Sequence, residues 1–284
     1  MAVNSPPRDA EYELFVVEYA RSKDQPVASL LLGVYDRGVI DLPFAFVVAR
    51  NAERVVLIDS GFQRKGKGAV MADKFAIAEW ISPARMLQAM GIEPEAVGDI
   101  FVTHAHYDHM GGIDLFPKAR IHIQKREYLS WIEAMALPPR YGFLTLAVNP
   151  EDLHYALTAA EEHRLILQEG DRDNLLPGIH ARLCEDAHTL GHQYIAVETA
   201  KGRHIVVGDC IYSYFNITGL DGKGVYIPLG FGVGSVWAQL KATDRIVAEA
   251  ENDLNRIVIL HDFERWTRFT EVKDVEGFKI FQVA

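Results

Sequence analysis

Residues Thr103–Gly112, with the sequence THAHYDHMGG, contain several side chains that can bind a metal ion. In an extended chain, side chains two residues apart point to the same side, so His104 and His106 can bind one ion together. A turn directly after them can direct Asp108 and His109 toward a second ion, and the Gly-Gly pair lets the backbone pass close. Imidazole and carboxylate ligands suit zinc, iron, manganese or cobalt better than calcium.

The density of these side chains favours metal binding over an ordinary structural role. A single histidine is more often a hydrogen-bonded core or surface residue than a ligand. Here three histidines and an aspartate fall within six residues, after an apolar run and before a glycine pair, and no packing role requires that composition. The remaining histidines lack such neighbours, and we expect them to be surface or hydrogen-bonded residues: His122, His154, His163, His180 and His204.

The H-x-H-x-D-H segment resembles the signature of the metallo-β-lactamase superfamily, and later parts of the chain match the pattern of that family. The acidic strand end before the signature is matched by Asp59, which would support a metal-binding histidine without touching the metal. The later motifs are matched by Asp186–His192, Val207–Cys210 and Ile259–Asp262. One departure is the Asp-Ala pair at 186–187, where family members often have Pro-Gly.

The resemblance implies a centre with two divalent metal ions, most readily zinc, with iron, manganese and cobalt as alternatives. One ion would be bound by His104, His106 and His188, the other by Asp108, His109 and His261, and Asp209 would bridge the two. The residue that matches His192 commonly supports the site without binding metal. Cys210 follows the proposed bridge, and alternation along an extended segment would turn its sulfur away. We therefore expect Cys210 to be a small buried residue rather than a ligand.

Two such ions, about 3.5 to 4 Å apart, supply a shared hydroxide near neutral pH and polarise a carbonyl oxygen, so hydrolysis is the expected chemistry. The leaving group then needs a proton, which Asp108 would relay. The sequence is most similar to N-acyl homoserine lactonases and related lactonases, through Tyr107, the His188–Gln193 run and Tyr212. In such lactonases a tyrosine three residues after the bridging aspartate donates a hydrogen bond to the substrate carbonyl or oxyanion. The resemblance therefore implies attack of a metal-bridging hydroxide on a lactone such as an N-acyl homoserine lactone.

Other reactions use the same metal signature. The main alternative is hydrolysis of a thioester, a β-lactam or another cyclic amide by the same hydroxide. Phosphodiesterases and iron-dependent redox enzymes also share these ligands. The net charge of −10 and the lack of a Lys/Arg cluster beside the motifs argue against a nucleic acid substrate. No flavin-binding segment is fused to the motifs, which argues against flavin-linked redox chemistry.

The composition is that of an ordinary globular protein, with 49% hydrophobic and 24% charged residues. No linker-like stretch is present, so we expect one domain over residues 1–284, with an insertion over one rim at about 137–163. Two cysteines form no disulfide framework, and neither a secretory signal nor an apolar run of about 18 residues is visible. We therefore expect a cytoplasmic enzyme that acts on a small molecule, without nucleic acid or membrane partners. A homodimer is a hypothesis that the sequence leaves open.

The elements that must position these residues follow from apolar runs for strands and helical periodicity for helices. The predicted strands are 13–20, 43–49, 54–59, 99–103, 120–123, 164–167, 179–184, 194–199, 203–207, 256–260 and 278–283, and the predicted helices are 82–91, 125–136, 151–162 and 235–251. Together with the resemblance, they predict an α/β (α+β) fold, a four-layer αββα sandwich of two mixed β-sheets flanked by helices. The glycine-rich loop 215–233 and the insertion would offer apolar walls to a substrate.

Overall fold

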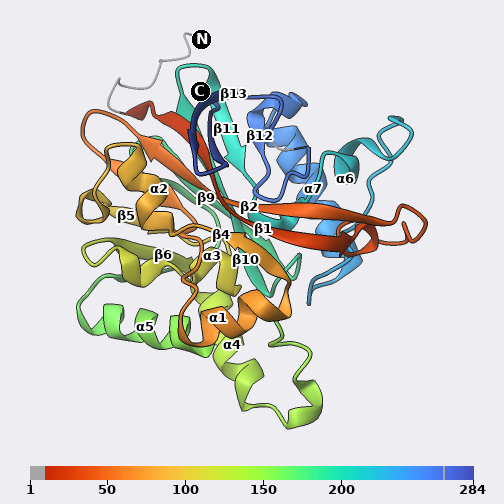
Figure 1. The fold of residues 1–284 in the computed structure, drawn as a ribbon, viewed down its shortest axis with the longest axis horizontal. Coiled ribbons are helices and arrows are strands. Elements are labelled where there is room, and N and C mark those ends of the chain that lie inside the picture. The colour runs from red at the N-terminus through yellow and green to blue at the C-terminus, as the bar shows by residue number, and fades with distance from the viewer. Residues whose placement is uncertain (1–9, 265) are drawn as a thin grey trace.

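Two β-sheets pack face to face between layers of helices in the computed structural model, which describes residues 10–264 and 266–284 (Figure 1). Within these residues, nine strands form the first sheet in the order β13-β14-β1-β2-β3-β5-β6-β7, with β4 paired to β1. Their bounds are β1 (Glu13–Pro26), β2 (Val39–Arg50), β3 (Val55–Ile58), β4 (Ile77–Trp80), β5 (Asp99–Phe101), β6 (Arg120–Gln124), β7 (Leu165–Gln168), β13 (Thr270–Val275) and β14 (Phe278–Gln282).

Five strands of the described chain form the second sheet, in the order β12-β11-β10-β9-β8. Their bounds are β8 (Arg172–Leu176), β9 (Ile179–Glu185), β10 (Gly191–Thr199), β11 (Gly202–Val206) and β12 (Ile257–Val258). Both sheets are mixed: β3, β5, β6 and β7 pair in parallel in the first sheet, and β11 pairs in parallel with β12 in the second. The predicted four-layer αββα sandwich of two mixed sheets is therefore confirmed.

Helices cover the outer face of each sheet (Figure 1). The α-helices are α1 (Gly66–Lys74), α2 (Pro83–Ala89), α3 (Tyr107–Met110), α4 (Lys125–Ala136), α5 (Pro150–Glu161), α6 (Phe215–Thr218) and α7 (Val236–Glu249). Short 3-10 turns are η2 (Val27–Ser29), η3 (Pro94–Ala96), η4 (Ile113–Leu115), η5 (Pro139–Tyr141), η6 (Gly208–Cys210) and η7 (Leu254–Arg256). Apolar residues of α1, α2, α4 and α5 pack on the first sheet, and those of α7 pack on the second.

Successive side chains of β1 pack alternately into two different hydrophobic cores. Leu14 and Val16 face the second sheet, whereas Phe15 and Val17 face the helices on the other side. This follows because successive side chains of a strand point to opposite faces. Since both faces of the sheet are covered, these four residues are all buried, and the strand appears in the sequence as a continuous apolar run.

The N-terminal hairpin is longer than predicted. The apolar run predicts a strand that ends at residue 20, but β1 continues to Pro26 and pairs there with Val39 of β2. The additional residues are mostly polar, and Lys23 forms an ion pair with Asp41 across the hairpin. Hydrophobic alternation therefore gave no signal for this part, which projects beyond the body of the sheet in Figure 1.

Several further elements were missed for similar reasons. Strand β13 has the sequence TEVKDV and is largely exposed at the edge of the first sheet, and β8 is mainly polar. Strand β4 has four residues and pairs only with the hairpin extension, and helix α1 begins at Gly66 without a side-chain cap. Because these elements depend on pairing or packing with distant segments, local composition predicts them poorly.

Only some of the helices begin with a side-chain cap. Ser82 occupies the N-cap position of α2, but its side chain accepts no capping hydrogen bond. Asn149 and Ser235 cap α5 and α7, where their side chains accept hydrogen bonds from the backbone N–H groups of Glu151 and Ala238.

In the region predicted as an insertion, residues 137–149 contain η5, and α5 packs in the same helix layer as α4. One domain over residues 1–284 stays a prediction.

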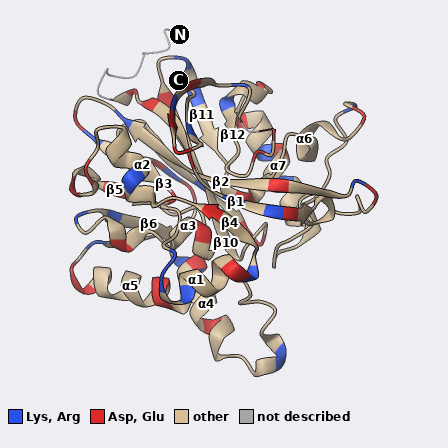
Figure 2. Ribbon diagram, viewed as in Figure 1, with Lys and Arg blue, Asp and Glu red and all other residues tan. Residues whose placement is uncertain are grey.

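The surface carries both signs of charge, as Figure 2 shows for Lys and Arg among Asp and Glu. Among the helices of residues 10–264 and 266–284, none is long and apolar enough to cross a membrane.

Asp152 in α5 is a buried carboxyl group that should make stability depend on pH. Asn149 Nδ2 donates to its Oδ1 at 2.8 Å, but its Oδ2 has no hydrogen-bond partner among the described residues. Burial, with the nearby Asp114 and Glu151 carboxylates, raises the pKa of Asp152 to about 8. The folded protein thus holds a proton that the unfolded chain releases near pH 4, so Asp152 destabilises the fold increasingly between pH 4 and 8.

The Asp152→Asn variant should therefore gain stability over the unsubstituted protein as pH rises. Asparagine retains an acceptor for Asn149 and carries no charge, so the gain should be smallest near pH 4 and rise by up to about 1.4 kcal/mol per pH unit between pH 4 and 8. Urea unfolding of both metal-free proteins at pH 4.5, 6.5 and 8.5 measures it. A gain that is the same at all three pH values would contradict the assignment.

Candidate metal centre

The seven predicted ligands lie in loops and short turns at the ends of strands. His104 and His106 follow β5, and α3 directly after them carries Asp108 and His109, which supplies the turn expected at that place. Asp59 follows β3, the parallel neighbour of β5, so both strands end at the same edge of the sheet. The second sheet provides the remaining three, from the β9–β10 turn, from η6 after β11 and from the segment after β12: His188, Asp209 and His261.

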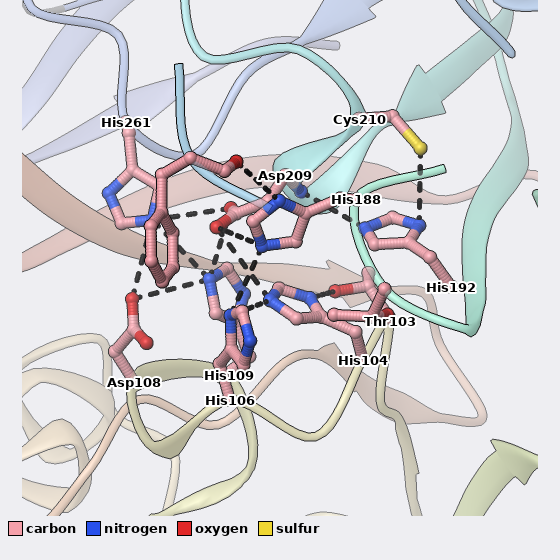
Figure 3. Close-up of polar contacts among 12 residues, drawn as sticks. Thr103, His104, His106, Asp108, His109, His188, His192, Asp209, Cys210 and His261 are labelled. Atoms are coloured by element: carbon pink, nitrogen blue, oxygen red, sulfur yellow. Dashed lines mark hydrogen bonds and ion pairs between the residues drawn. The ribbon is translucent and has the colours of Figure 1, made fainter. Parts of the chain in front are cut away.

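These side chains form two groups of buried donor atoms (Figure 3). The first group contains His104, His106, His188 and Asp209, and the second contains Asp108, His109 and His261. In the first, His106 Nδ1 lies 3.0 Å from His104 Nε2 and 3.1 Å from His188 Nε2. In the second, Asp108 Oδ2 lies 3.3 Å from His109 Nε2 and 3.4 Å from His261 Nε2. The structure thus brings together all seven residues that the sequence predicts as ligands.

The two oxygens of Asp209 face different groups. Oδ2 lies 3.4 Å from His188 Nε2 and 3.7 Å from His104 Nε2, whereas Oδ1 lies 3.1 Å from His109 Nε2 and 3.3 Å from His261 Nε2. Oδ1 is buried and accepts no hydrogen bond from the described residues. A buried carboxylate oxygen without a partner is costly, and a cation would satisfy it. The donor set therefore fits a pair of metal ions bridged by Asp209.

Hydrogen bonds on the far side of the rings orient the imidazoles. His261 Nδ1 donates to the carbonyl oxygen of Pro43 at 2.9 Å, and His188 Nδ1 donates to that of Phe231 at 3.2 Å. Because a carbonyl oxygen only accepts, each Nδ1 carries a proton, and in the neutral ring each Nε2 directs its lone pair to the centre. Such partners commonly hold metal-binding histidines in the correct orientation.

Asp59 links two of the segments that carry ligands. Its Oδ2 lies 2.7 Å from His109 Nδ1, and it accepts hydrogen bonds from Thr103 N at 2.7 Å and Thr103 Oγ1 at 2.8 Å. It contacts His109 on the ring face away from the centre and belongs to neither donor group. This is the place that the resemblance implies for an acidic residue that supports a ligand.

His192 and Cys210 lie next to the donor groups but outside both of them. His192 Nε2 accepts from the Asp209 backbone N–H at 3.1 Å, and its Nδ1 lies 3.2 Å from Cys210 Sγ (Figure 3). The sulfur does point away from the centre, but the predicted reason is wrong. Strand β11 ends at Val206, and Gly208–Cys210 form the turn η6 rather than an extended segment.

The two groups differ in their affinity for protons. Burial lowers the pKa of His106 to about 4 and that of His188 to about 3. Burial opposes the charged form of His261 as well, but the Asp209 and Asp108 carboxylates outweigh it and raise its pKa to about 9. Against the same effect of burial, the Asp209, Asp108 and Asp59 carboxylates likewise raise the pKa of His109 well above that of an ordinary histidine. At neutral pH the histidines of the first group therefore offer free lone pairs, whereas the second group holds protons on both His109 and His261.

Metal binding to the second group should therefore release protons from the metal-free protein. Because a metal ion must displace protons from both His109 and His261, affinity there should rise by up to about a hundredfold per pH unit below pH 9. The histidines of the first group are already neutral, so metal binding to this group should be independent of pH above about 5. Zinc calorimetry in two buffers of different ionisation enthalpy, at pH 6.5 and 7.5, counts the released protons. Binding of both ions without proton release would contradict this assignment, and the first ion serves as the internal control.

A cavity of about 150 Å³ opens onto the centre. Tyr212 is buried in its wall, with its ring centroid 5.7 Å from that of His188 and 5.6 Å from that of His261. Burial, with the Asp209 and Asp108 carboxylates, raises the pKa of the Tyr212 hydroxyl well above 10, so the hydroxyl keeps its proton. The other lining residues are Ser22, Gln25, Ser29, Leu30, Leu42, Phe44, Phe75, His106, Tyr107, Asp108, Ala147, Asp209, Phe231 and His261.

Much of this cavity wall was not predicted. The hairpin of β1 and β2 supplies Ser22, Leu30 and Phe44, among others, although no sequence motif marked it as part of the site. Of the two loops expected to form walls, 215–233 contributes Phe231 and 137–163 contributes Ala147. The buried residue Glu127, which contacts two ligand-bearing loops, was missed as well, and its position in an amphipathic helix gave no signal.

The other histidines lie outside both donor groups. His122 Nε2 contacts Asp99 at 2.7 Å and its ring stacks on Phe101, and His180 Nδ1 contacts Asp173 at 3.0 Å. His154 is exposed near the middle of α5, and His163 is exposed just beyond the end of that helix. His204 is buried in β11. Hydrogen bonding and exposure account for these residues without a metal.

A four-layer αββα fold with a buried His/Asp cluster compatible with two metal ions defines the class of metallo-hydrolases. The chain belongs to the metallo-beta-lactamase superfamily, whose sequence pattern matches residues 41–254. A protein of Mycobacterium tuberculosis described as a probable metallo-hydrolase is 26% identical over 263 residues, which cover 87% of this chain and 79% of that protein. An N-acyl homoserine lactonase of Bacillus sp. is 26% identical over 181 residues, covering 60% of this chain and 64% of the lactonase.

Solved structures with a similar fold include two lactonases. A quorum-quenching N-acyl homoserine lactone lactonase has a TM-score of 0.69 at 19% identity, covering 96% of this chain and all of that one. AidC, described as a dizinc quorum-quenching lactonase in complex with a product, has a TM-score of 0.66 at 19% identity, covering 97% and 96% of the two chains. At 19% identity, these two structures show a similarity of fold and nothing more.

Proposed function

We propose that this metallo-hydrolase opens lactones, with N-acyl homoserine lactones as the leading substrate class and two zinc ions as the cofactor. The observation that carries the proposal is Tyr212, a protonated hydroxyl group in the wall of a cavity that opens onto the donor cluster. Relatives described as N-acyl homoserine lactonases, and a structural neighbour described as dizinc, support the choice of substrate and metal.

The roles of the residues follow from their positions. Two divalent ions, when bound, supply hydroxide near neutral pH and polarise a carbonyl oxygen. Tyr212 donates a hydrogen bond to the substrate carbonyl oxygen and stabilises the negative charge that develops there. Asp108 faces the same cavity, and its carboxylate carries a proton from the attacking water to the alkoxide that leaves the ring. Asp209 and the imidazoles hold the centre in place.

The cavity walls suit an uncharged substrate with an apolar portion. Leu30, Leu42, Phe44, Phe75 and Phe231 supply apolar surface for an acyl chain, and Gln25 supplies polar groups for an amide. Among the described residues that line the cavity there is no lysine or arginine, which a phosphodiester or an anionic thioester substrate would favour. This distribution is the reason for preferring a neutral lactone.

Substrate profiling tests the proposal. Purified protein loaded with zinc, and in parallel with manganese, cobalt or iron, is offered N-acyl homoserine lactones of short and long chains, a plain γ-lactone, a glutathione thioester and a β-lactam. We expect turnover of the acyl homoserine lactones, with the metal content measured on the same samples. If protein containing two ions per chain hydrolyses the thioester or the β-lactam but none of the lactones, the proposal is wrong.

A further inference from the structure

Glu127 is a fully buried carboxylate that accepts four hydrogen bonds. It lies in the first turn of α4. Its Oε1 accepts from Ala105 N at 2.9 Å and from Trp131 Nε1 at 2.7 Å. Its Oε2 accepts from Thr189 Oγ1 and from Gly191 N, both at 2.8 Å. Each oxygen therefore has two donors, which together stabilise the charged form of a carboxylate inside the protein.

Three of these donors belong to loops that carry ligands of the first group. Ala105 lies between His104 and His106, and Thr189 follows His188 directly in the chain. The first loop comes from the first sheet and the second loop from the second sheet. Glu127 is thus a common acceptor that holds together backbone segments from both sheets, and it makes no hydrogen bond to Asp108, His109 or His261.

The close approach of the β9–β10 turn to α4 supports this connection. A Cβ atom on Gly191 would lie 2.2 Å from Glu127 N and 2.7 Å from Glu127 Cα, so only glycine allows the turn to come this near. On the other side, the ring of Trp131, which donates to Glu127, lies 5.9 Å from that of His106. The carboxylate is therefore packed on both sides and has little freedom to move.

We propose that Glu127 is a positioning residue that selectively sets the metal affinity of the group formed by His104, His106 and His188. The inference rests on the proposed metal centre and deepens it. An amide in place of the carboxylate retains the volume but turns an NH₂ group toward one pair of donors. The Thr189 hydroxyl can rotate to accept from that group, but an N–H such as that of Gly191 cannot, so at least one hydrogen bond is lost and the two loops are held less firmly. The second group, which has no such contact, keeps its affinity.

The test measures the two dissociation constants separately by competition with a chromophoric chelator. Variants His188→Ala and His261→Ala assign them, since each should remove the constant of its own group. In Glu127→Gln, we expect the first-group constant to weaken by about 10- to 100-fold, as for other residues that orient ligands, while the second changes by less than about threefold. Thermal unfolding of the metal-free proteins is recorded alongside.

Glu18→Gln is the matched control. Glu18 is also a buried carboxylate that accepts several hydrogen bonds, from Arg21 and from Lys279 N, and none from a ligand-bearing loop. This variant should lose thermal stability but keep both metal constants. Thr189→Val, which removes one donor to Glu127 and leaves the carboxylate in place, should weaken the first group by about two- to tenfold and serves if Glu127→Gln does not fold.

The outcomes separate this inference from the proposed function. Equal weakening of both constants in Glu127→Gln and Thr189→Val, or no weakening in either, would overturn the positioning role while the metal centre stands. Unsubstituted protein that binds no metal would overturn both. Two ions bound, selective weakening in the variants and no lactone turnover would support the positioning role and reject the lactonase.

Discussion

Replacing Asp209 by alanine is expected to remove both bound metal and activity. The two oxygens of this residue face different donor groups, at 3.1 Å from His109 Nε2 and 3.4 Å from His188 Nε2, so its loss weakens both sites at once. Turnover should fall by more than the roughly 10²–10³-fold that the loss of a single oxyanion-stabilising donor costs. Metal content by elemental analysis should fall below two ions per chain in the same preparation.

Asp99→Asn provides the control for this experiment. Asp99 is a buried aspartate of β5 that contacts Arg120 and His122 and belongs to neither donor group. Its substitution should reduce stability without changing metal content. Full activity of Asp209→Ala with two ions bound would show that Asp209 is not the bridge.

Replacing Tyr212 by phenylalanine should lower turnover and leave the metal centre intact. The ring keeps its contacts with His188 and His261, whereas the hydroxyl that would donate to the substrate is lost. Loss of one such donor predicts a decrease in kcat of about 10²-fold. Because the interaction strengthens as negative charge develops, KM should change much less than kcat. Steady-state kinetics with an acyl homoserine lactone, together with elemental analysis, measure both quantities.

Tyr214→Phe is the matched control for Tyr212→Phe. Tyr214 is also a buried tyrosine, but its hydroxyl donates to the Ile257 carbonyl oxygen at 2.8 Å and it does not line the cavity. The Tyr214→Phe variant should be less stable than the unsubstituted protein, and its kcat should stay close to that of the unsubstituted protein. Equal kcat values for Tyr212→Phe and the unsubstituted protein would remove Tyr212 from the mechanism.

The candidate metal ligands could be selected from the sequence because part of the information is local and the rest follows from a family resemblance. His104, His106, Asp108 and His109 are adjacent in the chain, and the geometry of a strand followed by a turn places them near each other whatever surrounds them. The more distant His188, Asp209 and His261 each follow a strand or lie between two strands. Apolar runs mark those strands, and a resemblance to a known family supplied the pairing between them.

The cavity walls and the residues that orient the ligands could not be predicted in this way. The extension of β1 beyond residue 20 is polar and is held by pairing with β2 and β4, so hydrophobic alternation ends before the segment that reaches the cavity. Glu127 lies 62 residues from Thr189 in sequence, and only the packing of α4 against the β9–β10 turn brings them together.

From the sequence came the main strands and helices of both sheets, because periodicity and residue type carry that information over short stretches, and the resemblance to a known family added the fold class and the choice of seven candidate ligands. The tertiary structure alone decided which group each oxygen of Asp209 faces, which hydrogen bonds orient the imidazoles, and which side chains enclose the cavity. These depend on contacts between segments far apart in the chain, whose distances and angles arise only when the two sheets and their helices pack together.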